Sequence, residues 1–341
     1  MGGSRSRRPT LADVAERVGT SAKTVSRVLN EDGPVSPATR ERVLAAVAEL
    51  GFRPDLLART MRTGGRDATV GLIVPEIANP FFGTVASGIG TAVRDRGLTL
   101  LLASSDAGPE KERTLVNSFL ARRVSGLVVV PAHGGDHRYL RRERTSGLPL
   151  VFLDRPASGL TADTVVSANS EGARAGTAHL AARGHRRIAF LGDRPAALYT
   201  RKERLRGYRA ALAEAGLPYD RRLVADAHGA EAAATAVHRL LALSDPPTAL
   251  FTANNLASLG ALPALAAAGR RDVALVGFDD LPLAGVVEPG LTVVAPDPAA
   301  MGSAAAGHLL SRLDGDGSAA RTTTVATRLV PRGSGELGPP D

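Results

Sequence analysis

Residues 10–30, TLADVAERVGTSAKTVSRVLN, constrain the fold of this chain more than any other stretch because they read as two short helices joined by a tight turn. The apolar residues of the first helix recur at intervals of three and four, which places one apolar stripe on a single face. Thr10 and Asp13 stand at the spacing of a short capping box, and Gly19 is placed to end the helix. Two helices of this size cannot bury enough surface alone. We therefore expect a third helix to close the hydrophobic core.

That third helix is predicted over residues 36–51. Ser36 is placed to cap it, Pro37 suits the first helical position, and Gly51 is placed to end it. The predicted core side chains of this helix are Val43, Leu44, Val47 and Leu50.

The second helix of the pair is predicted to bury Val25, Val28 and Leu29. Three helices in this order are typical of a helix-turn-helix domain, which places its second helix in the major groove of DNA. From the pattern alone, a helical hairpin that binds nothing is the alternative. The side chains left facing outward are Ser21, Ala22, Lys23, Ser26 and Arg27.

Charge and composition narrow the class of protein. Of the net charge of +8, +5 falls on residues 1–66, which hold 12 Lys and Arg against 7 Asp and Glu. A basic face supplies the salt-dependent, sequence-independent part of DNA affinity, although a basic tail alone is often only solvated. The chain has no Cys, which excludes disulfides, thiol catalysis and Cys-based zinc sites, and we expect no cofactor. No apolar run reaches the roughly 18 residues of a membrane span, and no secretory signal is visible, so a cytoplasmic protein is expected.

The stretch from Thr10 to Asn30, followed by V-S-P-A-T-R-E-R-V and by G-F-R-P-D, resembles the headpiece of the lactose-repressor and purine-repressor (LacI/GalR) family. The resemblance covers nearly the whole chain. It implies a ligand-responsive DNA-binding transcriptional regulator, usually a repressor, which binds a palindromic operator as a homodimer. It also implies that Ala22 and Lys23 face base edges and that Arg27 meets a guanine. The implied DNA-binding residues of the headpiece are Thr10, Leu11, Ser21, Ala22, Lys23, Thr24, Ser26, Arg27 and Asn30.

Residues 54–66, PDLLARTMRTGGR, read as a short and weakly amphipathic helix that is unstable alone. From the residues alone the segment is an interdomain linker. The family resemblance implies more, namely that hinge helices from two subunits fold together in the minor groove of the operator. In that arrangement Met61 is the wedge between base pairs, Ala58 packs beside it, and Arg59 reaches the backbone or the groove floor.

From residue 68 onward, short apolar runs alternate with helical segments, and this rhythm occurs twice. Buried strands separated by helices are typical of a parallel sheet that is covered on both faces. The expected fold class is therefore an all-α helix-turn-helix headpiece plus an α/β core of two doubly wound parallel-sheet subdomains, like a periplasmic binding protein. The predicted strands are 69–74, 98–104, 126–130, 150–154, 188–192, 248–252 and 273–280.

The expected domain organisation begins with a flexible basic arm over residues 1–9 and a headpiece over 10–53, and the hinge over 54–66 leads into a core over 67–331. The family resemblance implies three crossings between the core subdomains, near residues 167, 295 and 323. The first subdomain would then hold about 67–167 and 296–322, and the second about 168–295 and 323–331, with the last strand, TTTVATRLV, across the second. Residues 332–341 are rich in Pro and Gly without Leu heptads, so we expect a flexible tail and a dimer rather than a four-chain assembly.

Candidate ligand-binding residues follow from the rule that ligands of open α/β sheets bind beyond the carboxyl ends of the strands. Combined with the family resemblance, the rule selects an apolar wall, two carboxylates, a carboxamide and a guanidinium, which suit a sugar or another small polar metabolite. Phe82 could instead belong to the core, and His228 could be a solvated loop residue. The candidate effector-binding residues are Phe81, Phe82, Asp154, Arg204, His228, Asn254 and Asp279.

Two other classes of function were weighed against a regulator. A solute-binding transport protein could use the same core, but the headpiece and the missing signal peptide argue against it. For an enzyme, Asp154 and Asp279 could form a carboxylate pair, yet no nucleophile, metal cluster or phosphate-binding loop accompanies them, and no enzymatic activity is expected. The purine-binding members of the family carry Arg where Leu198 stands here, which argues against a purine as the effector.

Overall fold

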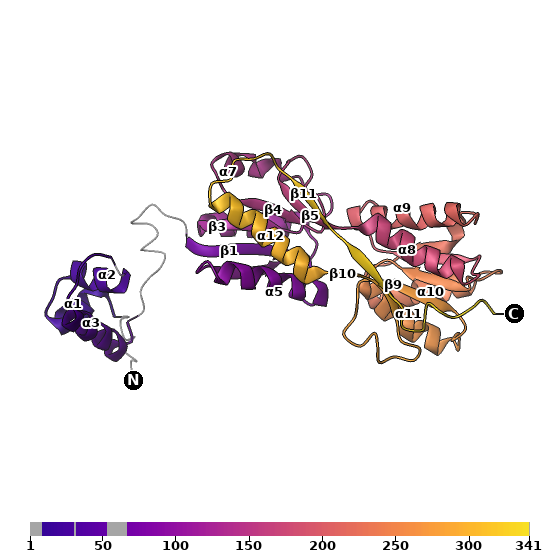
Figure 1. Cartoon of the computed structure of the whole chain (residues 1–341), viewed down its shortest axis with the longest axis horizontal. Helices are drawn as coiled ribbons and strands as arrows, with labels where there is room; N and C mark the ends of the chain where they lie inside the picture. Colours follow the sequence, from indigo (N-terminus) through magenta and orange to yellow (C-terminus); the bar gives the residue numbers. More distant parts are fainter. Residues whose placement is uncertain (1–8, 31, 53–66, 341) are drawn as a thin grey trace, which may run out of the picture. The chain divides into compact units, whose positions relative to one another are not determined.

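The computed structural model describes residues 9–30, 32–52 and 67–340, except for the side chain of Asn30 (Figure 1). It divides into two compact units, residues 1–67 and 68–341, which are described separately. The basic arm and the hinge fall on residues outside the described set. The predicted roles of Ala58, Arg59 and Met61, and of the Asn30 side chain, therefore stay predictions.

The first unit is the expected three-helix headpiece. Its hydrophobic core contains Val14, Val25 and Val43, all fully buried. Thr10 and Asp13 form the predicted capping box, in which the Thr10 backbone N–H donates to Asp13 Oδ2 at 2.6 Å and the Asp13 N–H donates to Thr10 Oγ1 at 3.3 Å. The helices are α1 (Leu11–Val18), α2 (Ala22–Asn30) and α3 (Pro37–Leu50).

The prediction that Leu44 of α3 lies in the core is wrong. Leu44 is 49% exposed, whereas Ala46 is buried. The buried face of the helix runs through Val43, Ala46, Val47 and Leu50, which is the spacing i, i+3, i+4, i+7. Leu44 follows Val43 by one residue and is turned about 100° away from that face.

The first lobe of the core is built on a six-stranded sheet with the order β11-β5-β4-β3-β1-β2. Helices α5 (Pro80–Arg94) and α12 (Pro298–Leu313) share one hydrophobic cluster with the sheet. On the other face lie α6 (Pro109–Ala121), η1 (His137–Leu140) and α7 (Arg141–Thr145). The strands are β1 (Asp67–Val74), β2 (Thr99–Ser104), β3 (Val124–Val129), β4 (Leu150–Leu153), β5 (Asp163–Ser167) and β11 (Thr322–Val325).

The second lobe repeats this plan with the order β12-β10-β9-β8-β6-β7. Helices α8 (Asn169–Ala182) and α9 (Tyr199–Glu214) cover one face, and α10 (Ala230–Leu241) and α11 (Asn255–Ala267) cover the other. Strand β12 is antiparallel to β10, while the pairs of β6 with β7 and β8, and of β9 with β8 and β10, are parallel. The strands are β6 (Ile188–Gly192), β7 (Val224–Asp226), β8 (Ala249–Thr252), β9 (Ala274–Phe278), β10 (Thr292–Pro296) and β12 (Thr327–Val330), and a short helix η2 (Arg221–Leu223) precedes β7.

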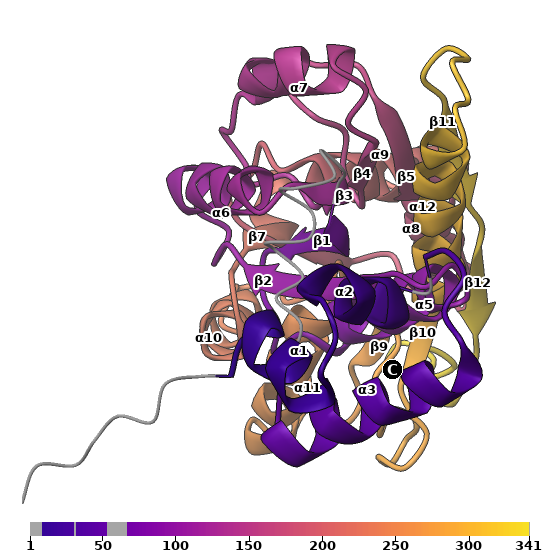
Figure 2. The ribbon, with the colours of Figure 1, turned by 90° about the vertical axis from the view of Figure 1, so that its left-hand side faces the viewer.

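The chain passes between the lobes between β5 and α8, between β10 and α12, and at Ala326. The expectation that residues 322–330 form one strand across the second subdomain is wrong, because β11 pairs with β5 in the first sheet and β12 pairs with β10 in the second. The third crossing is thus at residue 326 and not near 323. All three crossings lie at the same edge of the core, on the side of α12, β11 and β12 in Figure 2.

The expected flexible tail is wrong for residues 332–337, which pack against the second lobe. Ser334 is buried, and its hydroxyl donates to the Leu275 carbonyl at 2.6 Å and accepts from the Thr292 N–H at 2.9 Å. Glu336 contacts the His179 ring at 2.7 Å and accepts from the Thr292 hydroxyl at 2.7 Å. Small Gly and Ser residues let the backbone follow the sheet closely, so a composition typical of a tail is also compatible with a packed strap.

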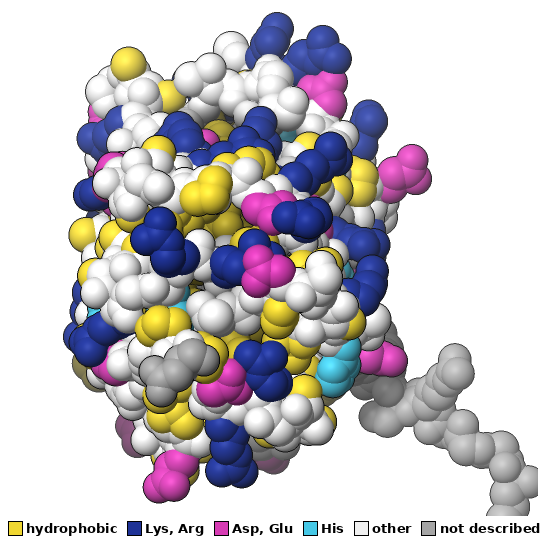
Figure 3. All heavy atoms as spheres, turned by 90° about the vertical axis from the view of Figure 1, so that its right-hand side faces the viewer, with side chains coloured by type: hydrophobic (Ala, Val, Ile, Leu, Met, Phe, Trp, Pro, Cys, Tyr) yellow, Lys and Arg dark blue, Asp and Glu magenta, His cyan; other side chains and the backbone are white. Residues whose placement is uncertain are grey.

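The face of the second lobe seen in Figure 3 carries scattered Lys and Arg side chains, several of them beside Asp or Glu, with hydrophobic side chains between them. Ion pairs of this lobe include Arg222 with Asp220 and Arg270 with Asp272, each at 2.8 Å. Exposed pairs of this kind add little to stability and keep the surface solvated. Within the described part of the chain, no helix is long and apolar enough to cross a membrane.

Candidate DNA-binding and effector sites

The outer face of α2 presents the residues predicted to contact DNA. Ala22, Lys23 and Arg27 are exposed, while Val25 and Val28 on the opposite face are buried in the headpiece core. Positive charge and a small side chain therefore lie together on one accessible helix face, as major-groove binding requires.

The residues at the starts of the two helices are held by capping. Ser21 Oγ accepts from the Thr24 N–H at 3.1 Å and lies 2.9 Å from the Thr24 hydroxyl, so Ser21 caps α2. The Thr10 hydroxyl donates to Asp13 at 2.7 Å, and Leu11 packs partly buried against the core. Ser26 is half-buried on α2. These contacts fix where any phosphate-binding groups would lie, and the DNA roles of Thr10, Leu11, Ser21, Thr24 and Ser26 stay predictions.

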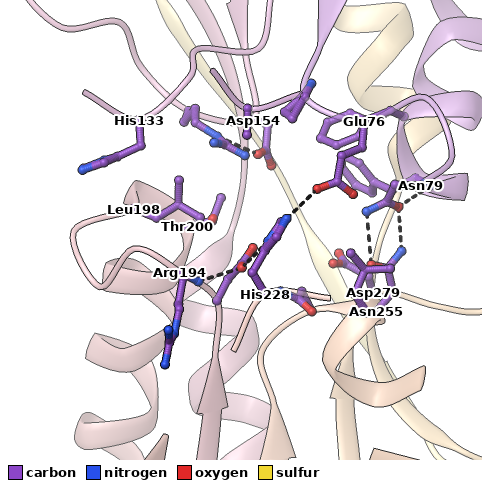
Figure 4. A pocket seen from close by; sticks show the side chains of 18 of the residues that line it. Glu76, Asn79, His133, Asp154, Arg194, Leu198, Thr200, His228, Asn255 and Asp279 are labelled. Atoms are coloured by element: carbon purple, nitrogen blue, oxygen red, sulfur yellow. Dashed lines mark hydrogen bonds and ion pairs between the residues drawn. The ribbon is translucent and has the colours of Figure 1, made fainter. Parts of the chain in front are cut away.

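The seven candidate effector residues line one cavity between the two lobes (Figure 4). They come from the segments after β1, β4, β8 and β9, from α9, and from the loop before α10, so the carboxyl ends of both sheets converge on it. The cavity encloses about 100 Å³, which is less than the roughly 300–1,000 Å³ of ordinary small-molecule sites. The lobes are therefore close together across this site.

Two aspartates occupy equivalent positions in the two lobes. Asp154 follows β4 and Asp279 follows β9, and both have a left-handed backbone, with φ of 66° and 71°. Their N–H groups donate to the Val165 and Val294 carbonyls of the next strand, at 2.8 and 2.9 Å. Non-glycine residues rarely adopt this conformation, and such strain concentrates at functional sites.

Arg204 is held rigidly at the base of the cavity. The close approach of α9 to α8 depends on Gly207, where a Cβ would lie 2.0 Å from the Ser170 carbonyl oxygen. Arg204 is only 4% exposed, and its Nε donates to Asn169 Oδ1 at 2.8 Å, while its Nη1 donates to the Ala253 carbonyl at 2.6 Å. The guanidinium also lies 3.7 Å from the centre of the Phe278 ring, a cation–π contact that fixes its plane.

Asp279 has an unsatisfied oxygen in this nearly dry environment. Its Oδ2 accepts from Arg204 Nη1 at a long 3.4 Å, and within the described residues Oδ1 is buried without a hydrogen-bond partner. Burial raises the pKa of Asp279 above its ordinary value, against the opposing effects of Arg204 and the Asn255 backbone, and the charge of Asp154 raises it further. A buried oxygen of this kind is expected to bind a donor such as a ligand hydroxyl.

Asn254 lines the cavity, but its carboxamide oxygen caps α11 by accepting from the Ala257 N–H at 2.7 Å. The neighbouring Asn255 crosses the cavity instead, and its Nδ2 donates to Asn79 Oδ1 at 2.7 Å. Asn79 returns a hydrogen bond of 3.3 Å and caps α5 through the Phe81 N–H at 3.1 Å.

The two phenylalanines form the apolar wall. Phe81 and Phe82 meet edge to face with ring centres 5.2 Å apart. Phe82 is buried in the hydrophobic cluster of the first lobe, which agrees with the alternative that it belongs to the core. It also borders the cavity.

His228 lies between carboxylates of both lobes. Its Nε2 is 3.0 Å from Glu76 Oε1 in the first lobe, and its Nδ1 is 3.0 Å from Asp193 Oδ1 in the second. The hydrogen bonds that the ring donates to Asp193 and, with a smaller effect, to Glu76 raise the pKa of His228 to about 10. The ring is half exposed, yet both of its nitrogens contact carboxylates, so His228 is a cavity residue with partners in both lobes.

Further cavity residues outside the predicted set include Glu76, His133, Arg155 and Asp193. Glu76 and Asp193 stand one or two residues beyond the carboxyl ends of β1 and β6, so the rule that selected Asp154 could have found them. Arg155 lies 3.3 Å from Asp154 and supplies its counter-charge.

Comparison with known proteins agrees with both halves of this description. Residues 10–55 match the family model of bacterial regulatory proteins of the lacI family, and residues 177–335 match that of the periplasmic binding protein-like domain. The HTH-type transcriptional regulator CelR of Thermobifida fusca is 38% identical over 97% of this chain and 99% of its own length. The transcriptional repressor PurR of Photobacterium profundum is 31% identical over 95% of this chain and 98% of its own.

Solved structures give the same result. The lac repressor dimer bound to operator and the anti-inducer ONPF has a TM-score of 0.83 at 28% identity and covers 97% of this chain and 100% of its own. A complex of the transcriptional regulator CelR with cellobiose has a TM-score of 0.72 at 34% identity, and the match covers 96% of this chain and 100% of the CelR chain. A helix-turn-helix headpiece joined to a two-lobed periplasmic-binding-protein-like core defines a DNA-binding transcriptional regulator. The chain belongs to the LacI family, and both the resemblance and the fold class predicted from the sequence are confirmed.

Proposed function

We propose that this regulator is a repressor that binds a palindromic operator as a homodimer and responds to a small polar effector, of sugar type, bound between the lobes of its core. The observation that carries the proposal is the partnerless Oδ1 of Asp279 beside the fixed guanidinium of Arg204. An acceptor and a planar donor side by side match the neighbouring hydroxyls of a sugar. Effector binding would change how the lobes sit and so, through the hinge, the affinity for the operator.

The rest of the cavity supports a sugar over a purine. Phe81 offers an apolar wall for the face of a sugar ring, and Asp154 offers a second carboxylate in the opposite lobe. The position of Leu198 is apolar and buried, where a cationic donor would suit a purine. Because a related regulator was solved with cellobiose, cellobiose is the first probe.

For the operator, we propose that specificity depends on Lys23 and Arg27, since Ala22 can offer only a methyl contact, for example to thymine. Both cations lie on the exposed face of α2. The hinge proposal for Ala58, Arg59 and Met61 rests on the family resemblance alone, and a flexible step at the centre of the operator would support it.

A binding role rather than a catalytic one is proposed for the cavity. The curated relatives are named as regulators. We place the protein in the cytoplasm, where a DNA-binding regulator acts.

The test is selection of operators from random duplex DNA by the purified full chain at fixed salt, first alone and then with cellobiose and a panel of other mono- and disaccharides. We expect a palindrome with a deformable central step, and a shift in its occupancy when the effector is added. If no preferred sequence emerges under any condition, the proposed function is wrong.

A further inference from the structure

Two polar bridges join the lobes across the effector cavity, and both start from the short segment after β1. At one end of this segment Glu76 contacts His228 at 3.0 Å, and at the other Asn79 pairs with Asn255 at 2.7 and 3.3 Å. Figure 4 shows His228 between the carboxylates and Asn79 facing Asn255. The first bridge is ionic and the second is neutral, so only the first depends on a proton.

The geometry of His228 defines its protonation state. Each ring nitrogen lies 3.0 Å from a carboxylate oxygen, of Glu76 on one side and Asp193 on the other. An ionised carboxylate only accepts hydrogen bonds, so both ring nitrogens must carry hydrogen. A neutral ring would point a lone pair at one of the two carboxylates.

We propose that the doubly protonated ring of His228 is a latch that holds the two lobes together across the effector cavity, and that closure of the cleft strengthens the binding of a proton to this ring. Nothing in this proposal depends on the identity of the effector or on the operator.

The stronger proton binding follows from how the partners are divided between the lobes. Asp193 belongs to the same lobe as His228 and stays beside it when the cleft opens, whereas Glu76 belongs to the other lobe and leaves. Closure therefore adds a second carboxylate to a ring that already has one. The closed form then binds the proton more tightly than the open form.

The sign of the pH dependence is fixed by this difference. In the closed form the hydrogen bonds to Asp193 and Glu76 raise the pKa of His228 to about 10, and in the open form, which keeps only the contact with Asp193, the pKa is raised less. The ratio of closed to open molecules is largest below the open-form pKa. Between the two pKa values it falls by up to about tenfold for each pH unit, and above the closed-form pKa the latch is lost.

Two cations near His228 already have partners at Asp226. Arg201 binds both oxygens of Asp226 at 2.9 Å, and Arg194 donates to the Asp226 carbonyl at 3.0 Å. The remaining charged or titratable groups that line the cavity are His133, Asp154 with Arg155, and Arg204 with Asp279.

The experiment measures the separation of the lobes directly. The chain has no Cys, so Arg122→Cys on the first lobe and Arg239→Cys on the second give two unique sites for fluorescent labels. Both positions are exposed, and their helical regions adjoin the edge strands β2 and β7, opposite the three crossings, where opening changes distances most. Single-molecule energy transfer of the full chain between pH 6 and 9.5, without ligand, then reports the closed fraction.

We expect the closed fraction to fall steadily as pH rises in the wild-type background. His228→Gln and Glu76→Gln should remove this dependence, because the first has no titrating ring and the second has no cross-cleft charge. Asn79→Ala is the matched control: it removes the neutral bridge, and should lower the closed fraction at every pH while keeping the slope.

A closed fraction that does not change with pH in the wild-type background overturns the proposal. So does an unchanged slope in Glu76→Gln, a variant that keeps the shape of the side chain and is checked for folding by circular dichroism. Failure to bind any operator or sugar would leave these distances unaffected, so the latch and the proposed function are tested separately.

Discussion

Arg204 and Asp279 show how single side chains in this core are prepared for a ligand. Their closest atoms are 3.4 Å apart, although the two opposite charges share a site from which water is almost excluded. Arg204 is held instead by Asn169, the Ala253 carbonyl and the Phe278 ring. The pair therefore leaves hydrogen-bonding groups, above all Asp279 Oδ1, for a ligand with adjacent hydroxyls to contact.

The variant Asp279→Asn tests whether this carboxylate binds the effector. The amide keeps the shape of the side chain but loses the charge, and a charge-assisted hydrogen bond contributes roughly 1.5–3 kcal/mol. We expect effector affinity, measured by calorimetry with the sugar that emerges from the operator screen, to fall between about tenfold and 150-fold, with operator binding in the absence of effector unchanged. Asp280→Asn is the matched control, since Asp280 pairs with Arg332 rather than facing the cavity. Equal effector affinity in both variants would exclude Asp279 from binding.

Arg27→Ala tests the residue placed to read a base. Loss of a bidentate contact with guanine should reduce discrimination at one base pair by roughly 1–3 kcal/mol, measured by titrating single-base variants of the selected operator. Thr24→Ala should instead weaken binding to all sequences alike, because Thr24 is predicted to contact phosphate. A uniform loss for Arg27→Ala would make it a phosphate contact too.

At the scale of elements, the sequence predicts those strands that are continuous apolar runs. The elements it misses are short or bounded by polar residues: β5 begins with Asp163, β7 has three residues, and β10 begins with Thr292 and ends at Pro296. The division of residues 322–330 between two sheets was not predictable from periodicity, because alternation runs unbroken through Ala326 while the pairing partner changes.

The sequence predicted which residues line the candidate site better than it predicted the contacts among them. All seven proposed effector residues line one cavity, because strand ends and the family resemblance together identified its border, and Arg204 on α9 came from the resemblance. Contacts across the cleft, such as Asn79 with Asn255 and Glu76 with His228, join residues more than 150 positions apart. No local pattern in a single sequence encodes such partners.

The packed strap of residues 332–337 leads to a stability prediction. Deleting residues 332–341 removes several buried hydrogen bonds of Ser334 and Glu336, each of which contributes roughly 0.5–1.5 kcal/mol. We expect thermal unfolding of the core to show a loss of roughly 3 kcal/mol or more. Deleting only residues 338–341 should change little, because Gly338, Pro339 and Pro340 are exposed. Equal stability of the two truncated chains would mean that the strap adds nothing.

At the scale of the whole molecule, exposed apolar side chains support the proposed dimer. Leu283 and Val286 are 67% and 75% exposed on the loop after β9, and Leu259 is exposed on α11. Both elements contribute buried residues to one hydrophobic cluster, so these side chains belong to one region of the second lobe. Large exposed apolar groups gathered in one region are typical of protein–protein contacts.

Replacing Leu283 and Val286 with Asp should convert the dimer to a monomer, as measured by sedimentation velocity. Operator affinity should fall with it, since a palindrome needs two headpieces. Tyr219→Asp changes another exposed large side chain of the second lobe, 41% exposed near η2, and should leave the dimer intact. A dimer that survives the double substitution would place the interface elsewhere.

The three crossings gather at one edge of both sheets, so the lobes are joined like the covers of a book along its spine. Resistance to rotation about such a spine depends on how far from it a contact acts. A bridge made at the spine opposes opening with almost no lever arm, whereas the segment after β1 contacts the second lobe beyond β8 and β7, several strands away. A few modest hydrogen bonds there act with a long lever arm, and small changes in them are enough to shift the cleft between its closed and open states.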